Sequence, residues 1–200
     1  MHRAVPAAAL AVVMTVAALS ASQALTERDA SNMQQKLQAI VDRGDADPAS
    51  RLPPLTTSLS EREVNAYLRF VAAPDLPVGL VDPTITIADR GRVSARAQID
   101  LDAVRKSKPR GTLDPLAYVS GVVEVTVAGA LEASGGRGKF DLEAATLGGM
   151  PVPETLVQEL VTYFTRTTEN PAGVSLARPF ELPARIQQVR TRAGQATIVQ

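Results

Sequence analysis

Apolar and polar residues alternate strictly in the middle of the chain, and this pattern constrains the fold more than any other feature. From Arg92 to Asp102, every second side chain is apolar. A period of two is typical of a β-strand with one dry and one wet face. Thr84 to Ile87 alternate in the same way, and a turn at Arg90-Gly91 would join the two strands as a hairpin. The dry face of such a hairpin must be covered, so we expect a layered fold.

A second, longer hairpin is expected between Val123 and Ala144, around a glycine-rich turn. Its apolar side chains alternate with charged ones on both strands. The residues expected on its dry face are Val123, Val125, Val127, Leu131, Phe140, Leu142 and Ala144. Long strands in one sheet have to twist and coil, so we expect a curved sheet that forms a half-open gutter. A third hairpin is expected from Ile186 to Val199.

Three segments space their apolar residues as a helix does: 26–43, 59–71 and the stretch that follows Pro153. The second of these begins with a capping box, in which Ser60 and Glu63 satisfy each other's backbone N–H groups. Helices and hairpins together predict an α+β fold. The expected architecture is a long curved antiparallel β-sheet, a meander of hairpins, wrapped on one face by two helices.

The expected organisation is a signal peptide at residues 1–24, an N-terminal helix and Pro-rich linker at 25–54, and a single α+β domain at 55–200. The linker is rich in proline and small residues, which favour irregular backbone. We therefore expect an N-terminal helical arm, which is either attached loosely or docked on the domain.

The first residues have the pattern of a secretory signal peptide. Arg3 precedes an apolar run from Ala7 to Leu19, and the small residues Ser22 and Ala24 occupy the −3 and −1 positions of a cleavage site. This run is too short to span a bilayer as a helix. An uncleaved N-terminal anchor is the alternative. We expect cleavage after Ala24 and a mature protein that is periplasmic or secreted and not transmembrane.

The composition argues against catalysis. The chain has no cysteine, and its one histidine, His2, lies in the expected signal peptide. The mature chain therefore lacks the side chains that carry most acid–base, nucleophilic and transition-metal chemistry. Basic and acidic residues number 21 each, and a balanced charge does not favour nucleic acid as a partner. We expect a protein that is not an enzyme and that has no cofactor and no metal.

Two short patterns have both a chemical and a structural interpretation. Asp100 and Asp102 resemble half of a hard-metal site, but the alternation from Arg92 onward already explains them as the polar face of an amphipathic strand, and we favour that interpretation. The turn Gly135 to Gly138 resembles a phosphate-binding loop, but such a loop leads from a strand into a helix. Here strands are expected on both sides, so we predict a hairpin turn.

The apolar faces of the helices and the sheet form the candidate site. They predict either an ordinary filled core or an elongated aliphatic groove between the curved sheet and the helices. A groove with few polar anchors suits an acyl chain or a similar hydrophobe. The candidate groove residues are Tyr67, Leu68, Val71, Val125, Val127, Leu131, Phe140, Leu142, Leu160 and Phe164. Tyr67, Tyr163 and Arg166 are the candidate polar anchors at its edges.

The segment Leu59 to Leu68 (LSEREVNAYL) resembles the opening helix of bacterial envelope proteins related to the tubular lipid-binding (TULIP) superfamily. The passage Gly148 to Pro153 (GGMPVP) is similar to their connection from sheet to helix. The resemblance covers roughly residues 55–200. It implies a curved antiparallel sheet wrapped around a long helix, and a protein that binds or carries lipid in the cell envelope. The many small residues on the strands, such as Ala95 and Ala97, leave open whether a groove is open or filled.

Two functions follow as hypotheses. The first is an exported, non-catalytic binding protein of the envelope that holds a lipid or another hydrophobic small molecule in the aliphatic groove. The alternative is an envelope scaffold or protein-interaction module with a filled core and no ligand. Its expected contacts with an envelope protein partner are the N-terminal arm at 26–43 and an edge strand near Ile198.

Overall fold

The computed structural model of this 200-residue chain describes residues 24–47, 53–107, 120–165, 175–176 and 178–200. The expected signal peptide therefore lies, except for Ala24, outside the described residues. The first half of the chain forms α1 (Glu27–Asp45), β1 (Thr56–Ser60), α2 (Glu61–Phe70), the short 3₁₀ helix η1 (Ala73–Asp75), β2 (Leu80–Ile87), β3 (Arg92–Asp100) and α3 (Leu101–Ser107). The second half forms β4 (Val122–Ser134), β5 (Arg137–Leu147), β6 (Met150–Pro151), α4 (Glu154–Thr165), β7 (Phe180–Glu181), β8 (Gln188–Arg192) and β9 (Gln195–Val199).

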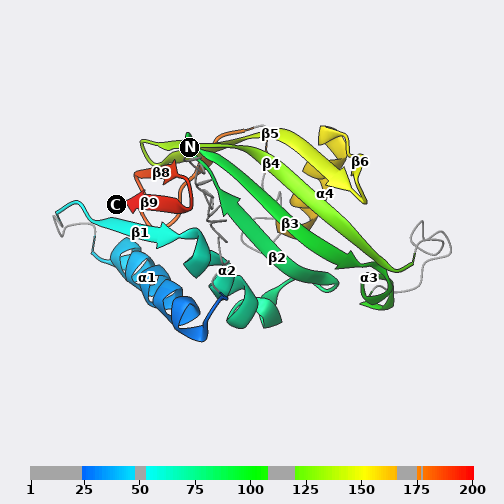
Figure 1. The fold of residues 1–200 in the computed structure, drawn as a ribbon. Coiled ribbons are helices and arrows are strands. Elements are labelled where there is room, and N and C mark those ends of the chain that lie inside the picture. Colours follow the sequence, from blue (N-terminus) through cyan, green and yellow to red (C-terminus); the bar gives the residue numbers. More distant parts are fainter. Residues whose placement is uncertain (1–23, 48–52, 108–119, 166–174, 177) are drawn as a thin grey trace, which may run out of the picture.

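The nine strands of the described residues belong to one antiparallel sheet, which confirms the predicted α+β class. The strand order is β1-β9-β8-β4-β3-β2. Strand β5 lies outside this order and pairs with β4 and with the short strands β6 and β7. In Figure 1 the strands β2 to β5 run together as a long twisted band, and β1, β8 and β9 lie at one end of it. The predicted hairpins are the pairs β2–β3, β4–β5 and β8–β9.

Helix α1 is part of the core and not a loosely attached arm. Met33 and Ile40 of α1 are buried together with Leu59 of β1 and Ile198 of β9. These four residues form a cluster against which half-buried side chains of α2, β8 and the chain before β8 pack. The proline-rich composition of the linker predicted its irregular backbone, but it carried no information on where the helix before it would dock.

Polar contacts also fasten α1 to the domain. Lys36 Nζ donates to the Ser58 carbonyl at 2.7 Å and lies 2.7 Å and 2.8 Å from the two carboxylate oxygens of Glu63. Arg62 Nε donates to Asp29 Oδ2 at 2.8 Å. Partial burial by itself would raise the pKa of Glu63, but hydrogen bonds from Lys36 and Ser60 outweigh it and hold this pKa below its ordinary value.

The segment before α2 is a strand, which the sequence did not predict. Residues Thr56 to Ser60 pair with β9 along their whole length. Strand β9 therefore lies between β1 and β8, and Ile198 is in an inner strand. The expectation of an edge strand near Ile198 was wrong, because β1 covers that edge. The capping box is confirmed: Ser60 accepts from the Glu63 N–H, and the Glu63 carboxylate accepts from the Ser60 N–H.

The long strands differ from the expected alternation in two places. At the end of β3, Asp100 Oδ1 accepts from the Ala103 N–H at 2.9 Å, and the chain continues as α3 in place of a strand. In β5, the pairing shifts between Leu142 and Ala144, so that one extra residue forms a β-bulge. Beyond the bulge the faces are exchanged. Ala144, expected on the dry face, is exposed, and Ala145 is buried.

Candidate functional site

One face of the band β2–β5 is apolar along almost its whole length. Residues that pair directly across antiparallel strands share a face, so the register defines this surface. Its rows, from one end to the other, are Ile99–Val123, Ala97–Val125–Leu147, Ala95–Val127–Ala145, Val93–Gly129–Leu142 and Leu131–Phe140. We call this surface the apolar sheet face. It brings together the five candidate groove residues that lie on strands: Val125, Val127, Leu131, Phe140 and Leu142.

Most of the larger side chains of the apolar sheet face are only half-buried, whereas Ile87 of β2, which pairs with Val93 on this face, is buried. The half-buried side chains include Val123, Val125, Val127, Leu131, Phe140 and Leu142. The buried residues of β4 and β5 on this face are small, for example Ala133 and Ala145, each 7% exposed. No large side chain among the described residues is fully buried. The half-buried side chains of the apolar sheet face are thus partly accessible.

The hairpin end of the apolar sheet face is closed by aromatic side chains. A β-carbon added to Gly129 would lie 2.8 Å from Cε1 of Phe140, so the Phe140 ring lies directly on the backbone of Gly129. At Gly138 the added atom would meet the ring of Phe180 at 2.7 Å and Leu182 Cδ2 at 3.0 Å. Strand β7 holds Phe180 there, because it pairs directly with Gly138. These two close approaches require glycine, and they seal this end with apolar atoms.

The opposite end of the apolar sheet face is exposed. Leu147 is 37% exposed, and its pairing partner in β6, Met150, is 69% exposed. In the first turn of α4, Leu156 is 44% exposed while Val157 is buried. Aliphatic side chains are therefore accessible where the strands end and α4 begins. We call Leu147, Met150 and Leu156 the open end.

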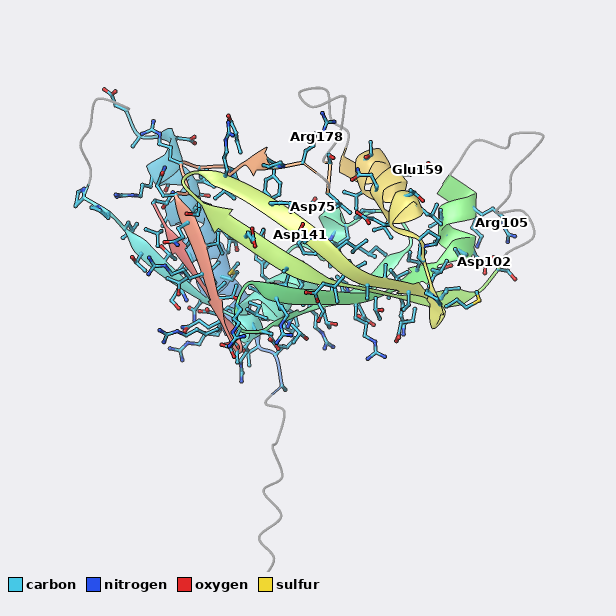
Figure 2. The ribbon with its side chains drawn as sticks, turned by 90° about the horizontal axis from the view of Figure 1, so that it is seen from above. Asp75, Asp102, Arg105, Asp141, Glu159 and Arg178 are labelled. Carbon is cyan, nitrogen blue, oxygen red and sulfur yellow. The ribbon has the colours of Figure 1, made fainter. Side chains whose placement is uncertain are left out.

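Helices α3 and α4 lie on the same side of the long strands, close to the open end (Figure 2). On α3, Asp102 Oδ1 and Arg105 Nη2 form an ion pair at 2.6 Å, and Asp102 Oδ2 accepts from the Gly121 N–H at 3.0 Å. Asp102 therefore lies on a helix and not, as the sequence predicted, on the polar face of a strand, and both carboxylates have structural roles. Asp100 caps α3, and Asp102 holds the start of the chain that leads into β4.

The candidate groove residues on the helices divide into separate groups. Tyr67 packs against the core cluster formed by α1, β1 and β9, so it does not lie on the apolar sheet face. Leu68 is half-buried and lies one turn after Asn65, on the side of α2 that contacts β2. Val71 follows Tyr67 by one turn and is also half-buried. Leu160 and Phe164 belong to α4, but their side chains, like Tyr163 and Arg166, lie outside the described part.

The opposite face of the band is polar and charged. Arg96 and Glu124 form an ion pair at 2.6 Å across β3 and β4. Lys139 and Asp141 form another at 2.6 Å on β5. The hydrogen bond to Asp141 and the charge of that carboxylate raise the pKa of Lys139. One face of the sheet is thus suited to water and the other to hydrocarbon.

Sequence reasoning missed several residues that shape the site. Phe180 and Leu182, which close the hairpin end, lie more than 40 residues after the glycine turn that they cover. Their only sequence signal is their i, i+2 spacing, which is weak in so short a stretch. Asn65 and Glu61 of α2, which bind the edge of β2, were not among the candidate residues, although both lie in the predicted helix 59–71.

Within the described ranges, no group of three His, Cys, Asp or Glu residues is arranged to hold a metal ion. None of the helices in the described part of the chain is both long enough and apolar enough to cross a membrane. The chain matches no protein-family model, no curated protein and no solved structure. Its function must therefore be inferred from its own residues.

Proposed function

We propose that this protein is an exported, non-catalytic binding protein of the cell envelope that holds a lipid chain or a similar hydrophobe against its apolar sheet face. One observation carries the proposal: a continuous aliphatic surface that is closed by Phe140 and Phe180 at one end and exposed at the other. A linear hydrocarbon has the shape and the chemistry for such a surface, and it needs few polar partners along its length.

The likeness of the Leu59 to Leu68 segment to the opening helix of TULIP-related envelope proteins supports the same proposal. So does the pattern of a signal peptide at residues 1–24, which would place the protein outside the cytoplasm. In this proposal a hydrophobe enters at the open end, near Leu147 and Met150. Its chain then lies over Val125 and Val127 toward Phe140.

The alternative, a scaffold without ligand, was based on two contact elements that the fold now uses internally. Helix α1 buries Met33 and Ile40 in the core, and Ile198 lies in an inner strand. The inner position of Ile198 removes one of these elements, but α1 still has an exposed face that includes Val41, so the partly accessible apolar sheet face is what favours lipid binding. The lipid-binding proposal is therefore the one that we carry forward.

The experiment is native mass spectrometry with lipid extraction on the protein purified from its own envelope fraction. We expect a stoichiometric bound lipid whose mass identifies its class. A protein that is free of lipid, and stays so after incubation with envelope lipids, would overturn the proposal.

Matched variants test the location of the site. Val125→Trp fills the middle of the apolar sheet face and should abolish lipid binding, whereas Glu124→Trp, its neighbour on the polar face, should retain it. Val125→Trp could unfold the protein, so a second pair uses exposed positions. Leu147→Lys with Met150→Lys should impair uptake, whereas Val81→Lys with Val122→Lys should not. The last two valines are also exposed and lie near the same end, but they share the polar face with Gln98 and Asp100. Equal lipid content in all four folded variants would contradict the proposed location.

A further inference from the structure

Two hairpin tips far apart in the sequence are fastened to each other. The Gly91 N–H, in the β2–β3 turn, donates to Thr191 Oγ1 of β8 at 2.7 Å. The Gly194 N–H, in the β8–β9 turn, donates to the Ile87 carbonyl at 2.8 Å. The neighbouring Ala193 N–H donates to Asp89 Oδ1 at 3.2 Å. These bonds hold the two tips in one fixed arrangement.

Four arginines lie at this junction. Arg90 and Arg92 flank Gly91, and Arg190 and Arg192 flank Thr191. All four are exposed. We call these four residues the arginine face.

The register places three of these arginines on the same, polar face of the sheet. Arg92 pairs with Ala130 of β4, and Gln188 pairs with Ser134 of the same strand. Ala130 and Ser134 are four positions apart on the same strand, so their side chains share a face. Arg190 and Arg192 follow Gln188 at even spacing and point the same way. Arg92, Arg190 and Arg192 therefore extend from one surface.

The charge of the arginine face is not balanced by ion pairs. Among the described residues, the ion pairs involve Lys36, Arg62, Arg96, Arg105 and Lys139. At the junction itself, Arg190 Nε binds the neutral amide of Gln188 at 2.9 Å. Two carboxylates also lie at the junction: Asp89 accepts from the Ala193 N–H and Glu61 from the Ile87 N–H, so four arginines face two acidic side chains there. Glu132 lies directly opposite Lys139.

We propose that the arginine face docks the protein on an anionic membrane surface by binding the phosphate groups of lipid headgroups. A guanidinium group binds phosphate oxygens in a planar, two-pronged geometry, and basic side chains are attracted to the negative potential of such a surface. The side chains extend from one face of a sheet, which suits a flat, extended partner.

An acidic protein partner fits this surface less well. Tight protein interfaces depend on buried aromatic or aliphatic anchors. The exposed large hydrophobic residues of the described chain are Val41, Leu55, Phe70, Val78, Val81, Val122, Leu147, Met150 and Leu156, and none belongs to β3, β8, β9 or their turns. Electrostatic adsorption to a lipid surface needs no such anchor.

The test is sedimentation of the mature protein with vesicles. We expect binding to vesicles that contain phosphatidylglycerol, weaker binding at high salt, and little binding to pure phosphatidylcholine. The variant Arg92→Gln/Arg190→Gln/Arg192→Gln should bind about a hundredfold more weakly at low salt, because each basic residue near such a surface accounts for about a fivefold change. Arg90 is left intact because its φ of 59° belongs to the turn.

The control variant Arg28→Gln/Lys106→Gln/Arg178→Gln removes the same charge from exposed positions elsewhere and should bind nearly as the parent does. Circular dichroism and thermal midpoints establish that both variants fold. Equal loss of binding in the two variants would show a net-charge effect and overturn the proposal. Unchanged binding of the first variant, or equal binding of the parent to phosphatidylcholine, would also overturn it.

Two further binding experiments distinguish a membrane from other anionic ligands. Arginine-dependent binding of inorganic phosphate without binding to vesicles would indicate a soluble phosphate ligand and overturn membrane docking. Arginine-dependent binding of polyaspartate alone would indicate an acidic protein partner and do the same. The docking proposal does not depend on the proposed lipid binding, because Val125→Trp should leave vesicle adsorption unchanged whatever it does to bound lipid.

Discussion

The side-chain amide of Asn65 forms two hydrogen bonds with the backbone of Ile85. Asn65 Nδ2 donates to the Ile85 carbonyl at 2.8 Å, and Asn65 Oδ1 accepts from the Ile85 N–H at 2.7 Å. Ile85 belongs to β2, an edge strand of the sheet, so these bonds replace those that a further strand would make. One turn earlier in α2, Glu61 accepts from the Ile87 N–H at 2.7 Å. Helix α2 thus protects the edge of the sheet with its side chains.

Asn65→Ala should destabilise the fold by about 1–3 kcal/mol, because it leaves a backbone donor and an acceptor of β2 without partners. Chemical denaturation measures this change. Asn32→Ala is the matched control, since Asn32 is exposed on α1, and its effect should stay within about 0.5 kcal/mol. Faster hydrogen exchange at the Ile85 N–H should accompany the loss. Equal stability of the two variants would show that the edge contact does not matter.

Lys36 and Glu63 should be energetically coupled, because their ion pair joins α1 to α2 and the Glu63 side chain is only 13% exposed. A double-mutant cycle with Lys36→Met and Glu63→Gln should give a coupling free energy of about 1 kcal/mol. The Lys139–Asp141 pair is a suitable comparison, since both of its side chains are more than 40% exposed. Its coupling should be smaller, because solvent screens it more strongly. A larger coupling for this exposed pair would contradict the docking of α1 by Lys36.

Stability should decline in acid because of Glu63. Its folded pKa lies below its ordinary value near 4.5, so the unfolded chain binds more protons in this range. The free energy of unfolding should therefore be fully present above about pH 5 and fall as the pH drops through the folded pKa. Asp29 adds to the same trend, because hydrogen bonds from Thr26 and Arg62 lower its pKa.

Denaturant titrations at a series of pH values measure this trend. Glu63→Gln should reduce the slope below pH 5, since an amide does not titrate. An unchanged slope in the variant would assign the acid sensitivity to other carboxylates.

The bulge in β5 predicts opposite effects at two adjacent alanines. Ala144→Lys should change the free energy of unfolding by no more than about 0.5 kcal/mol, because Ala144 is exposed on the polar face. Ala145→Lys should cost about 3 kcal/mol or more, because Ala145 is 7% exposed on the apolar sheet face. Thermal or chemical denaturation distinguishes them, and the reverse order would place the bulge elsewhere.

Local patterns in the sequence predicted most of the individual elements. The period of two identified β3 and β4, and the capping box of Ser60 and Glu63 identified the start of α2. Two errors have a common cause. The sequence does not show that Asp100 caps a helix or that Glu143 is the extra residue of a bulge. The first depends on the hydrogen bond from the Ala103 N–H, and the second on the register between β4 and β5, and both are set by the tertiary structure.

The candidate site was predicted in part. Val125, Val127, Leu131, Phe140 and Leu142 share one face, as their alternation indicated. Tyr67 was assigned to the same groove, but it packs in the core cluster with α1. Helical spacing shows that a residue lies on an apolar face. It does not show whether that apolar face packs against α1 and the core cluster or against the apolar sheet face.

By itself, the sequence determined the long hairpins and the two N-terminal helices, and which side of most of these elements is apolar, because periodicity and capping act between residues a few positions apart. Only the tertiary structure decided that α1 joins the core, that β1 covers β9, and that Phe180 seals the end of the apolar sheet face. It also brought the arginines of two distant hairpins to one surface. These relationships join residues tens of positions apart. They depend on shape, register and the satisfaction of backbone hydrogen bonds, which no local pattern contains.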